Sequence, residues 1–113
     1  MSTDCLFCKI VRKEIPAKLV DEGTDYVAFR DIDPKAPVHI LVVPREHVSS
    51  LNELTDAALV GRLTLAAADI ARREGIAESG YRTVINTNRG AGQTVFHLHL
   101  HLLGGRSLGW PPG

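Results

Sequence analysis

The chain has 113 residues, a length typical of one domain with a modest hydrophobic core. Its 13 Lys and Arg residues balance its 13 Asp and Glu residues, so no excess of charge favours binding to nucleic acid or to a membrane surface. No apolar run approaches the length of a membrane span, and charged residues interrupt the first 15 positions, unlike in a signal peptide. We therefore expect a cytoplasmic protein with reduced cysteines.

The N-terminal part predicts a short helix followed by three strands. Residues 6–13 favour a short helical turn, and residues 17–32 favour two short strands around a tight turn at Gly23. The apolar and β-branched run 38–44 indicates a mostly buried strand that ends at Pro44.

The clearest helix is expected over residues 56–74. Thr55 is the expected N-cap, Arg72 and Arg73 suit the last turn, and Gly75 follows as a stop signal. The apolar residues recur with helical spacing on one face: Leu59, Leu63, Ala66, Ala67 and Ile70.

The C-terminal part predicts two further strands, over 81–86 and 96–103, separated by a polar, glycine-rich loop at 87–94. This order of elements predicts an α+β fold: an antiparallel sheet of about five strands, one long helix and a short N-terminal helix. Neither a linker-like stretch nor an internal repeat divides the sequence, so we expect a single domain over 1–113.

Three of the five histidines alternate with leucines in "HLHLHLL", at positions 97, 99 and 101. In a strand, successive side chains point to opposite faces, so the three imidazoles are expected on one face, roughly 7 Å apart. The leucines then fill the core side, and this burial fixes the register of the strand.

Three imidazoles on one face suit either metal binding or phosphate chemistry. The preceding loop favours phosphate chemistry. Gly90 and Gly92 allow close backbone approach to an anion, and Gln93 and Thr94 add side-chain donors. The loop lacks the Lys-Ser/Thr ending of a P-loop, so it does not predict a nucleoside-triphosphatase.

Four stretches carry a resemblance to a known family: "KEIPAK" at 13–18, residues 28–47, "GQTVFHLHLHLLGGR" at 92–106, and "WPPG" at 110–113. Together they resemble the nucleotide-binding branch of the histidine triad (HIT) superfamily. The resemblance implies a HIT-like fold in which two protomers of a homodimer join into one continuous sheet. It also implies that the tail, residues 104–113, contributes to the dimer and to the active site.

The resemblance further implies hydrolysis of purine nucleoside 5′-phosphoramidates, such as adenosine 5′-phosphoramidate and adenylated lysine, with no cofactor needed for catalysis. His99 matches the nucleophile that forms a nucleotidyl-histidine intermediate, and His101 matches the contact to the phosphate oxygens. His97 and His39 would support the nucleophile, and Thr94 would assist the leaving amine. The alternatives are a dinucleoside polyphosphate hydrolase or nucleotidyl transferase of the same superfamily, or a nucleotide-sensing interaction module.

The implied nucleotide site is centred on Asp31, which matches the acid that accepts both ribose hydroxyls, although "DIDP" also suits a simple turn. Around the base the resemblance implies an apolar slot, in which Ile32 and Leu41 would equally suit an ordinary core. The other implied nucleotide contacts are Phe7, Phe29, Asn86, Gly92, Gln93, Thr94, His99, His101 and Trp110.

Cys5 and Cys8 form a C-x-x-C pair, which in a cytosolic chain suggests metal or redox chemistry before a structural disulfide. A zinc site needs two further ligands, and the candidates are His47 and His97. Some bacterial members of the superfamily bind zinc with such a set, which implies an optional structural zinc here. The alternative is a pair of free thiols, with Cys8 buried and Cys5 in a frayed terminus.

Overall fold

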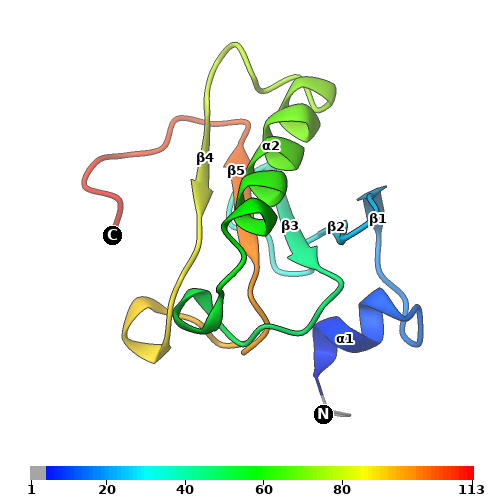
Figure 1. The fold of residues 1–113 in the computed structure, drawn as a ribbon. Coiled ribbons are helices and arrows are strands. Elements are labelled where there is room, and N and C mark those ends of the chain that lie inside the picture. Colours follow the sequence, from blue (N-terminus) through cyan, green and yellow to red (C-terminus); the bar gives the residue numbers. More distant parts are fainter. Residues whose placement is uncertain (1–4) are drawn as a thin grey trace.

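The computed structural model describes residues 5–113, which form an antiparallel sheet with a long helix across one face (Figure 1). The helices are α1 (Leu6–Val11) and α2 (Ala57–Arg73), with short 3-10 turns at Leu51–Glu53 and Arg89–Ala91. The strands are β1 (Leu19–Glu22), β2 (Tyr26–Arg30), β3 (Val38–Pro44), β4 (Tyr81–Val84) and β5 (Leu100–Gly104).

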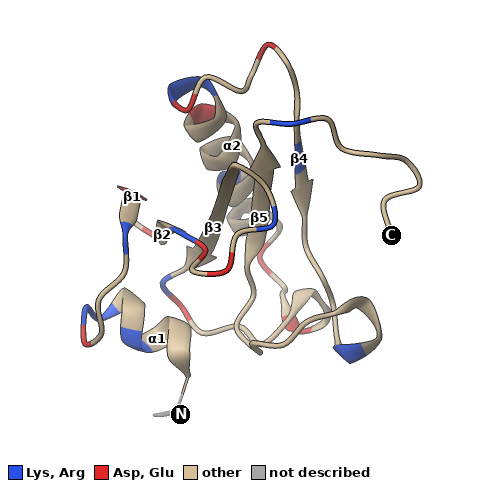
Figure 2. Ribbon diagram, turned by 180° about the vertical axis from the view of Figure 1, so that it is seen from behind, with Lys and Arg blue, Asp and Glu red and all other residues tan. Residues whose placement is uncertain are grey.

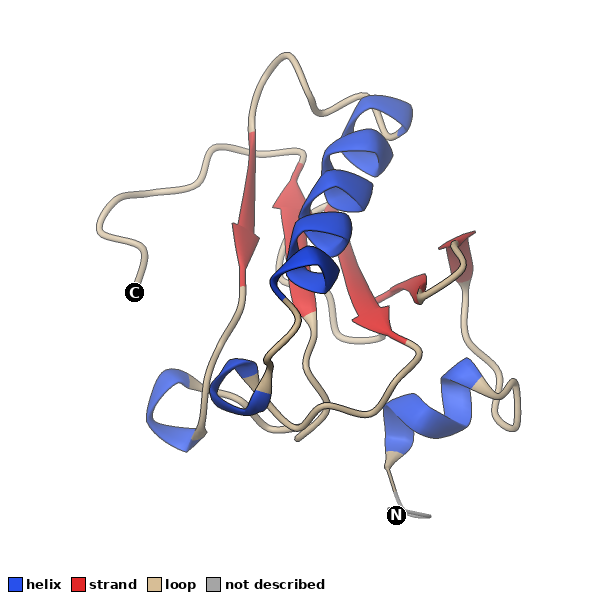
Figure 3. Cartoon of the chain, in the orientation of Figure 1, coloured by secondary structure: helices blue, strands red, loops and turns tan. Residues whose placement is uncertain are grey.

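The strands lie in the order β1-β2-β3-β5-β4, and each neighbouring pair is antiparallel. This arrangement confirms the expected α+β class, and Figure 3 shows α2 lying across the sheet. The apolar face of α2 packs on Ile40, Val42, Leu100 and other residues of one sheet face. On the opposite face α1 packs against β2 and β3, so the two faces have separate apolar clusters.

Helix α2 begins one residue later than predicted, because Asp56 rather than Thr55 is its N-cap. The Asp56 carboxylate accepts hydrogen bonds from the backbone N–H groups of Ala58 and Leu59, at 3.0 and 3.4 Å. A carboxylate also interacts favourably with the positive end of the helix dipole, an advantage that a threonine hydroxyl lacks. At the other end, Arg72 and Arg73 occupy the last turn, as predicted.

The last strand is shorter than predicted, because β5 begins at Leu100 and the predicted strand residues 96–99 lie outside the sheet. The partner strand β3 ends at Pro44, which has no N–H with which to extend the ladder. Beyond it, the N–H of Leu98 donates instead to the carbonyl oxygen of Val48, at 2.6 Å. The predicted strand 81–86 likewise ends early, at Val84.

The predicted division between leucines and histidines is nevertheless found. Leu98, Leu100 and Leu102 are at most 2% exposed and join the core beneath α2. His101 pairs with Leu41 across β5 and β3, and Leu41 belongs to the cluster on the opposite face. The burial of the leucines against α2 therefore directs the histidines toward α1.

Positive and negative side chains are interspersed along the ribbon rather than gathered into a stripe of one sign (Figure 2). Among residues 5–113, no helix combines the length and the apolar character needed to cross a bilayer. The tail after β5 runs past the outer edge of β4, where the Arg82 guanidinium donates to the carbonyl oxygen of Gly109 at 2.8 Å.

Candidate functional site

The His99 ring is oriented by a backbone contact through one of its two nitrogens. Its Nδ1 lies 2.7 Å from the carbonyl oxygen of His97, and a carbonyl only accepts, so Nδ1 carries the proton. The Nε2 atom of neutral His99 therefore keeps its lone pair. Burial lowers the pKa of this 7%-exposed imidazole, which keeps it neutral at physiological pH. His99 has the tautomer that nucleophilic attack through Nε2 requires.

His39 and His101 are oriented by a chain of hydrogen bonds. The backbone N–H of Lys35 donates to His39 Nδ1 at 3.0 Å, so neutral His39 carries its proton on Nε2. That Nε2 lies 2.9 Å from His101 Nδ1, which must accept the bond. His101 then carries its own proton on Nε2. With its ring centroid 4.9 Å from that of His99, His101 offers a hydrogen-bond donor beside the nucleophile.

The buried state of His101 makes stability depend on pH. Burial, with smaller contributions from His99 and His39, lowers the pKa of His101 from its ordinary 6.5 to about 4. Between these values the unfolded chain binds the proton and the folded chain does not, so the free energy of unfolding falls as the pH falls. The slope is about 1.4 kcal/mol per pH unit for each proton.

We therefore expect the His101→Gln variant to lose less stability than the wild type between pH 7 and pH 5. Urea unfolding of both proteins in the same two buffers measures the difference. Parallel losses in the two proteins would show that His101 does not resist protonation in the folded state.

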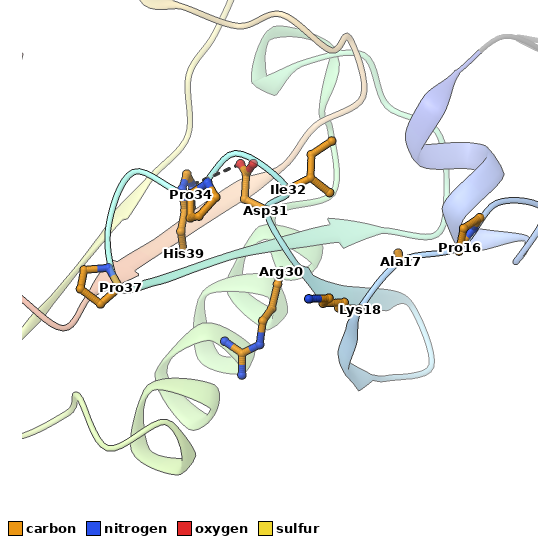
Figure 4. Close-up of a pocket in the computed structure, with 9 residues that line it drawn as sticks. All are labelled: Pro16, Ala17, Lys18, Arg30, Asp31, Ile32, Pro34, Pro37 and His39. Carbon is orange, nitrogen blue, oxygen red and sulfur yellow. Dashed lines mark ion pairs between the residues drawn. The ribbon is translucent and has the colours of Figure 1, made fainter.

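Asp31 serves both the turn and the histidine cluster. Its Oδ1 accepts the N–H of Asp33 at 2.8 Å, as the turn interpretation of "DIDP" predicts. Its Oδ2 lies 3.5 Å from His39 Nε2, the contact marked by the dashed line in Figure 4. The carboxylate is about 20% exposed, so its oxygens remain accessible to a ligand. The turn and a binding role are thus compatible in this residue.

A cavity of about 540 Å³ opens beside Asp31, as Figure 4 shows. Of the predicted nucleotide residues, Asp31 and Ile32 line it, and Ile32 is 97% exposed. The predicted slot residues Phe7, Phe29 and Leu41 do not line it; they are at most 5% exposed in the apolar cluster under α1. His39, predicted to support the nucleophile, also lines this cavity. Sequence reasoning did not assign the remaining residues of the wall: Pro16, Ala17, Lys18, Arg30, Pro34 and Pro37.

The glycine-rich loop is held by the amide of Gln93, which is only 3% exposed. Its Oε1 accepts the N–H of Asn88 at 2.7 Å, and its Nε2 donates to the carbonyl oxygens of Ser49 and Val95. Both amide protons are engaged inside the protein, so Gln93 shapes the loop. Gly92 has φ +97°, a conformation that other residues rarely adopt.

The remaining predicted residues lie farther apart. Thr94 is exposed and lines a second cavity of about 520 Å³, which Cys5 and His47 also line. Asn86 is half-buried just after β4. Trp110 is 81% exposed, with the Arg82 guanidinium 5.9 Å from its ring centroid.

The four predicted metal ligands meet at the N-terminus of α1. The ligand atoms of Cys5, Cys8, His47 and His97 all lie within 4.8 Å of one another, and no disulfide joins the two cysteines. His97 Nδ1 lies 3.3 Å from Cys5 Sγ and 3.6 Å from Cys8 Sγ, and His47 Nδ1 lies 3.3 Å from Cys8 Sγ. Segments separated by up to 92 residues are thus brought to one point.

This geometry fits a tetrahedral zinc ion. Zinc–sulfur bonds of about 2.3 Å and zinc–nitrogen bonds of about 2.1 Å place S and N ligand atoms about 3.6 Å apart. The tautomer of His97 fits as well, because its Nε2 lies 2.8 Å from the carbonyl oxygen of Pro44 and must donate. The His97 lone pair is therefore on Nδ1, facing the thiols. The residues present fit a structural Cys₂His₂ site with four protein ligands.

A second group of metal-type ligands, Asp31, His39 and His101, is equally close together but fits an ion poorly. His39 Nε2 carries a proton toward this group, because Lys35 occupies the lone pair on Nδ1. Binding a metal there would require breaking the Lys35 hydrogen bond. The hydrogen bonds of the three alternating histidines also argue against one ion shared by them. The lone pair of His97 faces the cysteines, and that of His101 accepts a hydrogen bond from His39.

Three backbone atoms that sequence reasoning missed determine these tautomers: the carbonyl oxygens of Pro44 and His97 and the N–H of Lys35. No sequence pattern marks them, because any residue offers a carbonyl and nearly any residue offers an N–H. His97 lies on the α1 side with His99, as predicted, since Phe7 packs on both rings. Its ring nitrogen Nδ1 nevertheless faces the cysteine cluster, and its carbonyl oxygen accepts the Nδ1–H of His99.

Comparisons with known proteins agree with this architecture. Residues 12–108 match the model of the HIT domain family. The chain is 57% identical, over the full length of both proteins, to an uncharacterized HIT-like protein of Synechococcus elongatus. It is 48% identical to the purine nucleoside phosphoramidase of Escherichia coli K12, over 96% of this chain and 93% of that protein.

A solved structure shows the same fold. The HIT family hydrolase of Legionella pneumophila Philadelphia 1 superimposes with a TM-score of 0.95 at 49% identity, covering 97% of this chain and all of the other. The sequence match spans most of the chain, and the fold and the alternating histidines agree with it. The chain therefore belongs to the HIT domain family.

Proposed function

We propose that the protein hydrolyses the P–N bond of purine nucleoside 5′-phosphoramidates, including AMP-NH₂ and AMP-lysine types, through a nucleotidyl-His99 intermediate. The observation that carries the proposal is the tautomer of His99, since its Nδ1–H donates to the His97 carbonyl, which leaves the lone pair of the neutral ring on Nε2. The 48% identity to a purine nucleoside phosphoramidase supports the choice of substrate class.

In the first step, His99 Nε2 attacks the α-phosphorus, the P–N bond breaks, and the leaving amine takes up a proton that the exposed Thr94 hydroxyl relays from solvent. The N–H on Nε2 of His101 donates to a phosphoryl oxygen, where negative charge increases in the transition state. In the second step, water attacks the same phosphorus and the bond to His99 breaks. The products are the nucleoside monophosphate, the free amine and regenerated His99.

The nucleoside is proposed to occupy the cavity beside Asp31. The Asp31 carboxylate accepts the ribose hydroxyls, and exposed Ile32 with Pro16 and Ala17 provides apolar surface for the base. Burial of Phe7, Phe29 and Leu41 supports a different role for them, as the packed layer behind the histidines. Gly92 and Asn86 remain proposed contacts on the phosphate side.

We further propose a structural zinc ion at Cys5, Cys8, His47 and His97, and a homodimer whose tail, with Trp110, reaches the partner's site. The open outer edge of β4, next to the tail, supports a sheet that continues into a second copy. The zinc holds α1 to the loop segments and takes no part in bond breaking. We propose that catalysis needs no cofactor, and the proposed compartment is the cytoplasm.

The direct test is release of AMP from an adenosine 5′-phosphoramidate with an aromatic amine leaving group. Rapid quench with base, which preserves the acid-labile P–N bond of a nucleotidyl-histidine, followed by peptide mass spectrometry should find one nucleotidyl group on the peptide that contains His99. Binding of AMP without turnover would reject the enzyme and favour a nucleotide-sensing module. Preferential cleavage of dinucleoside polyphosphates would favour the other hydrolase branch.

The Asp31→Asn variant separates the two roles of this residue. Its amide oxygen can still accept the N–H of Asp33, so the turn should persist and the melting temperature should change little. Loss of the charged acceptor should raise KM by about 10- to 100-fold, which corresponds to the 1.5–3 kcal/mol of charge-assisted hydrogen bonds. With the wild type, a 2′,3′-dideoxy substrate should raise KM by a similar factor, because it lacks the hydroxyls that Asp31 binds. With the variant, the same substrate should raise KM no further. Independent, additive losses would contradict ribose binding by Asp31.

A further inference from the structure

His97 connects the cysteine cluster to the proposed nucleophile through its own backbone. Its Nδ1 faces Cys5 and Cys8, its Nε2 donates to the Pro44 carbonyl, and its carbonyl oxygen accepts the Nδ1–H of His99 at 2.7 Å. Rotating or shifting residue 97 therefore changes the one bond that fixes the tautomer and direction of His99.

Helix α1 provides a second connection. In the sequence, Phe7 lies between Cys5 and Cys8. Its ring packs edge-on against His97 and His99, with centroid separations of 5.9 and 5.0 Å. A six-residue helix is too short to be stable by itself, so its placement depends on its contacts. A ligand that holds Cys5 and Cys8 in place therefore also holds the Phe7 ring against His99.

We propose that the Cys5/Cys8/His47/His97 set is a positioning device for the nucleophile, so that a bound metal ion orients His99 through the carbonyl of residue 97 and through Phe7. In this role Cys5, Cys8 and His47 are positioning residues that never touch substrate. The inference rests on the proposed phosphoramidase function for its kinetic consequence, but its structural consequence is measurable without turnover.

The first readout is nuclear magnetic resonance of protein labelled with ¹⁵N in its histidine rings. In the metal-loaded protein, His99 should show a single tautomer, with hydrogen on Nδ1. Stripping the metal or introducing Cys8→Ser should move the His99 signals toward a mixture of tautomers, while the His39 signals, fixed by Lys35, stay unchanged. Lys9→Ala, on the same helix but with no metal ligand, is the control that should leave both sets of signals in place.

The second readout is the division between kcat and KM. Misplacing the nucleophile should lower kcat by about 10- to 100-fold and change KM by no more than about twofold, because the nucleoside pocket is separate. Cys8→His, which again offers a metal ligand, should restore most of kcat. If stripped protein or Cys8→Ser fails to fold, exchange of zinc for the larger Cd²⁺ keeps the cross-link, and it should still shift the His99 signals.

His99 signals and kcat that are unchanged by stripping, by Cys8→Ser or by Cd²⁺ exchange would overturn the inference. If the metal-loaded wild type shows no turnover, the proposed phosphoramidase function is wrong. The ¹⁵N signals of His99 would still show whether the metal orients that ring.

Discussion

The His99→Ala variant is expected to release AMP from an adenosine 5′-phosphoramidate at least about 10³-fold more slowly than the wild type. The variant removes His99 Nε2, the oriented lone pair that is proposed to attack phosphorus, and losses of this size are typical when the attacking group is deleted. A steady-state assay with a chromogenic aromatic amine measures kcat and KM for both proteins.

Two controls make this result specific to the nucleophile. AMP should bind the variant within a few-fold of the wild-type affinity, because the ribose contact proposed for Asp31 remains. Added imidazole should restore part of the activity by attacking phosphorus from the emptied space. Comparable turnover by the variant and the wild type would assign the nucleophile to a different residue.

Removal of the metal is expected to have the largest effect on stability. If the free zinc concentration is 1,000 times Kd, binding to the folded state alone contributes about 4 kcal/mol to the free energy of unfolding. The ion would cross-link α1, the segment after β3 and the segment before β5, in addition to the Leu98–Val48 hydrogen bond and the ring contacts of Phe7 and His47 that already join them. Chelation should therefore lower the melting temperature of wild-type protein clearly.

The Cys5→Ser variant provides the matched comparison, because it keeps nearly the same shape and loses one zinc ligand. Without chelator, its melting temperature should already be lower than that of the wild type. Adding the chelator should change it little. Metal content by mass spectrometry of protein purified without a histidine tag should be near one equivalent in the wild type. Less than about a tenth of an equivalent would reject the zinc site.

Local patterns in the sequence were sufficient to predict the elements of the fold. The spacing of Leu59, Leu63 and Ile70 predicted α2, and the alternation of leucine with histidine predicted which side chains face the core. The residue types also offered Cys5, Cys8, His47 and His97 as candidate metal ligands, whereas the choice of His99 as nucleophile came from the family resemblance. The predictions of the helix and of the buried strand face succeeded because periodicity is a local property of a chain.

Tertiary structure decided what each of these residues can do. Pro44 ends the β3–β5 ladder, so His97 leaves the strand and turns its ring to Cys5 and Cys8. The proton positions on the ring nitrogens depend on backbone partners that the fold supplies, such as Lys35 N–H for His39. The nucleoside-sized cavity, with its wall of prolines, likewise exists only once β2 and β3 have paired. The sequence alone determined which residue types are available for chemistry, whereas the fold decided their tautomers and neighbours, because these depend on contacts between distant segments of the chain.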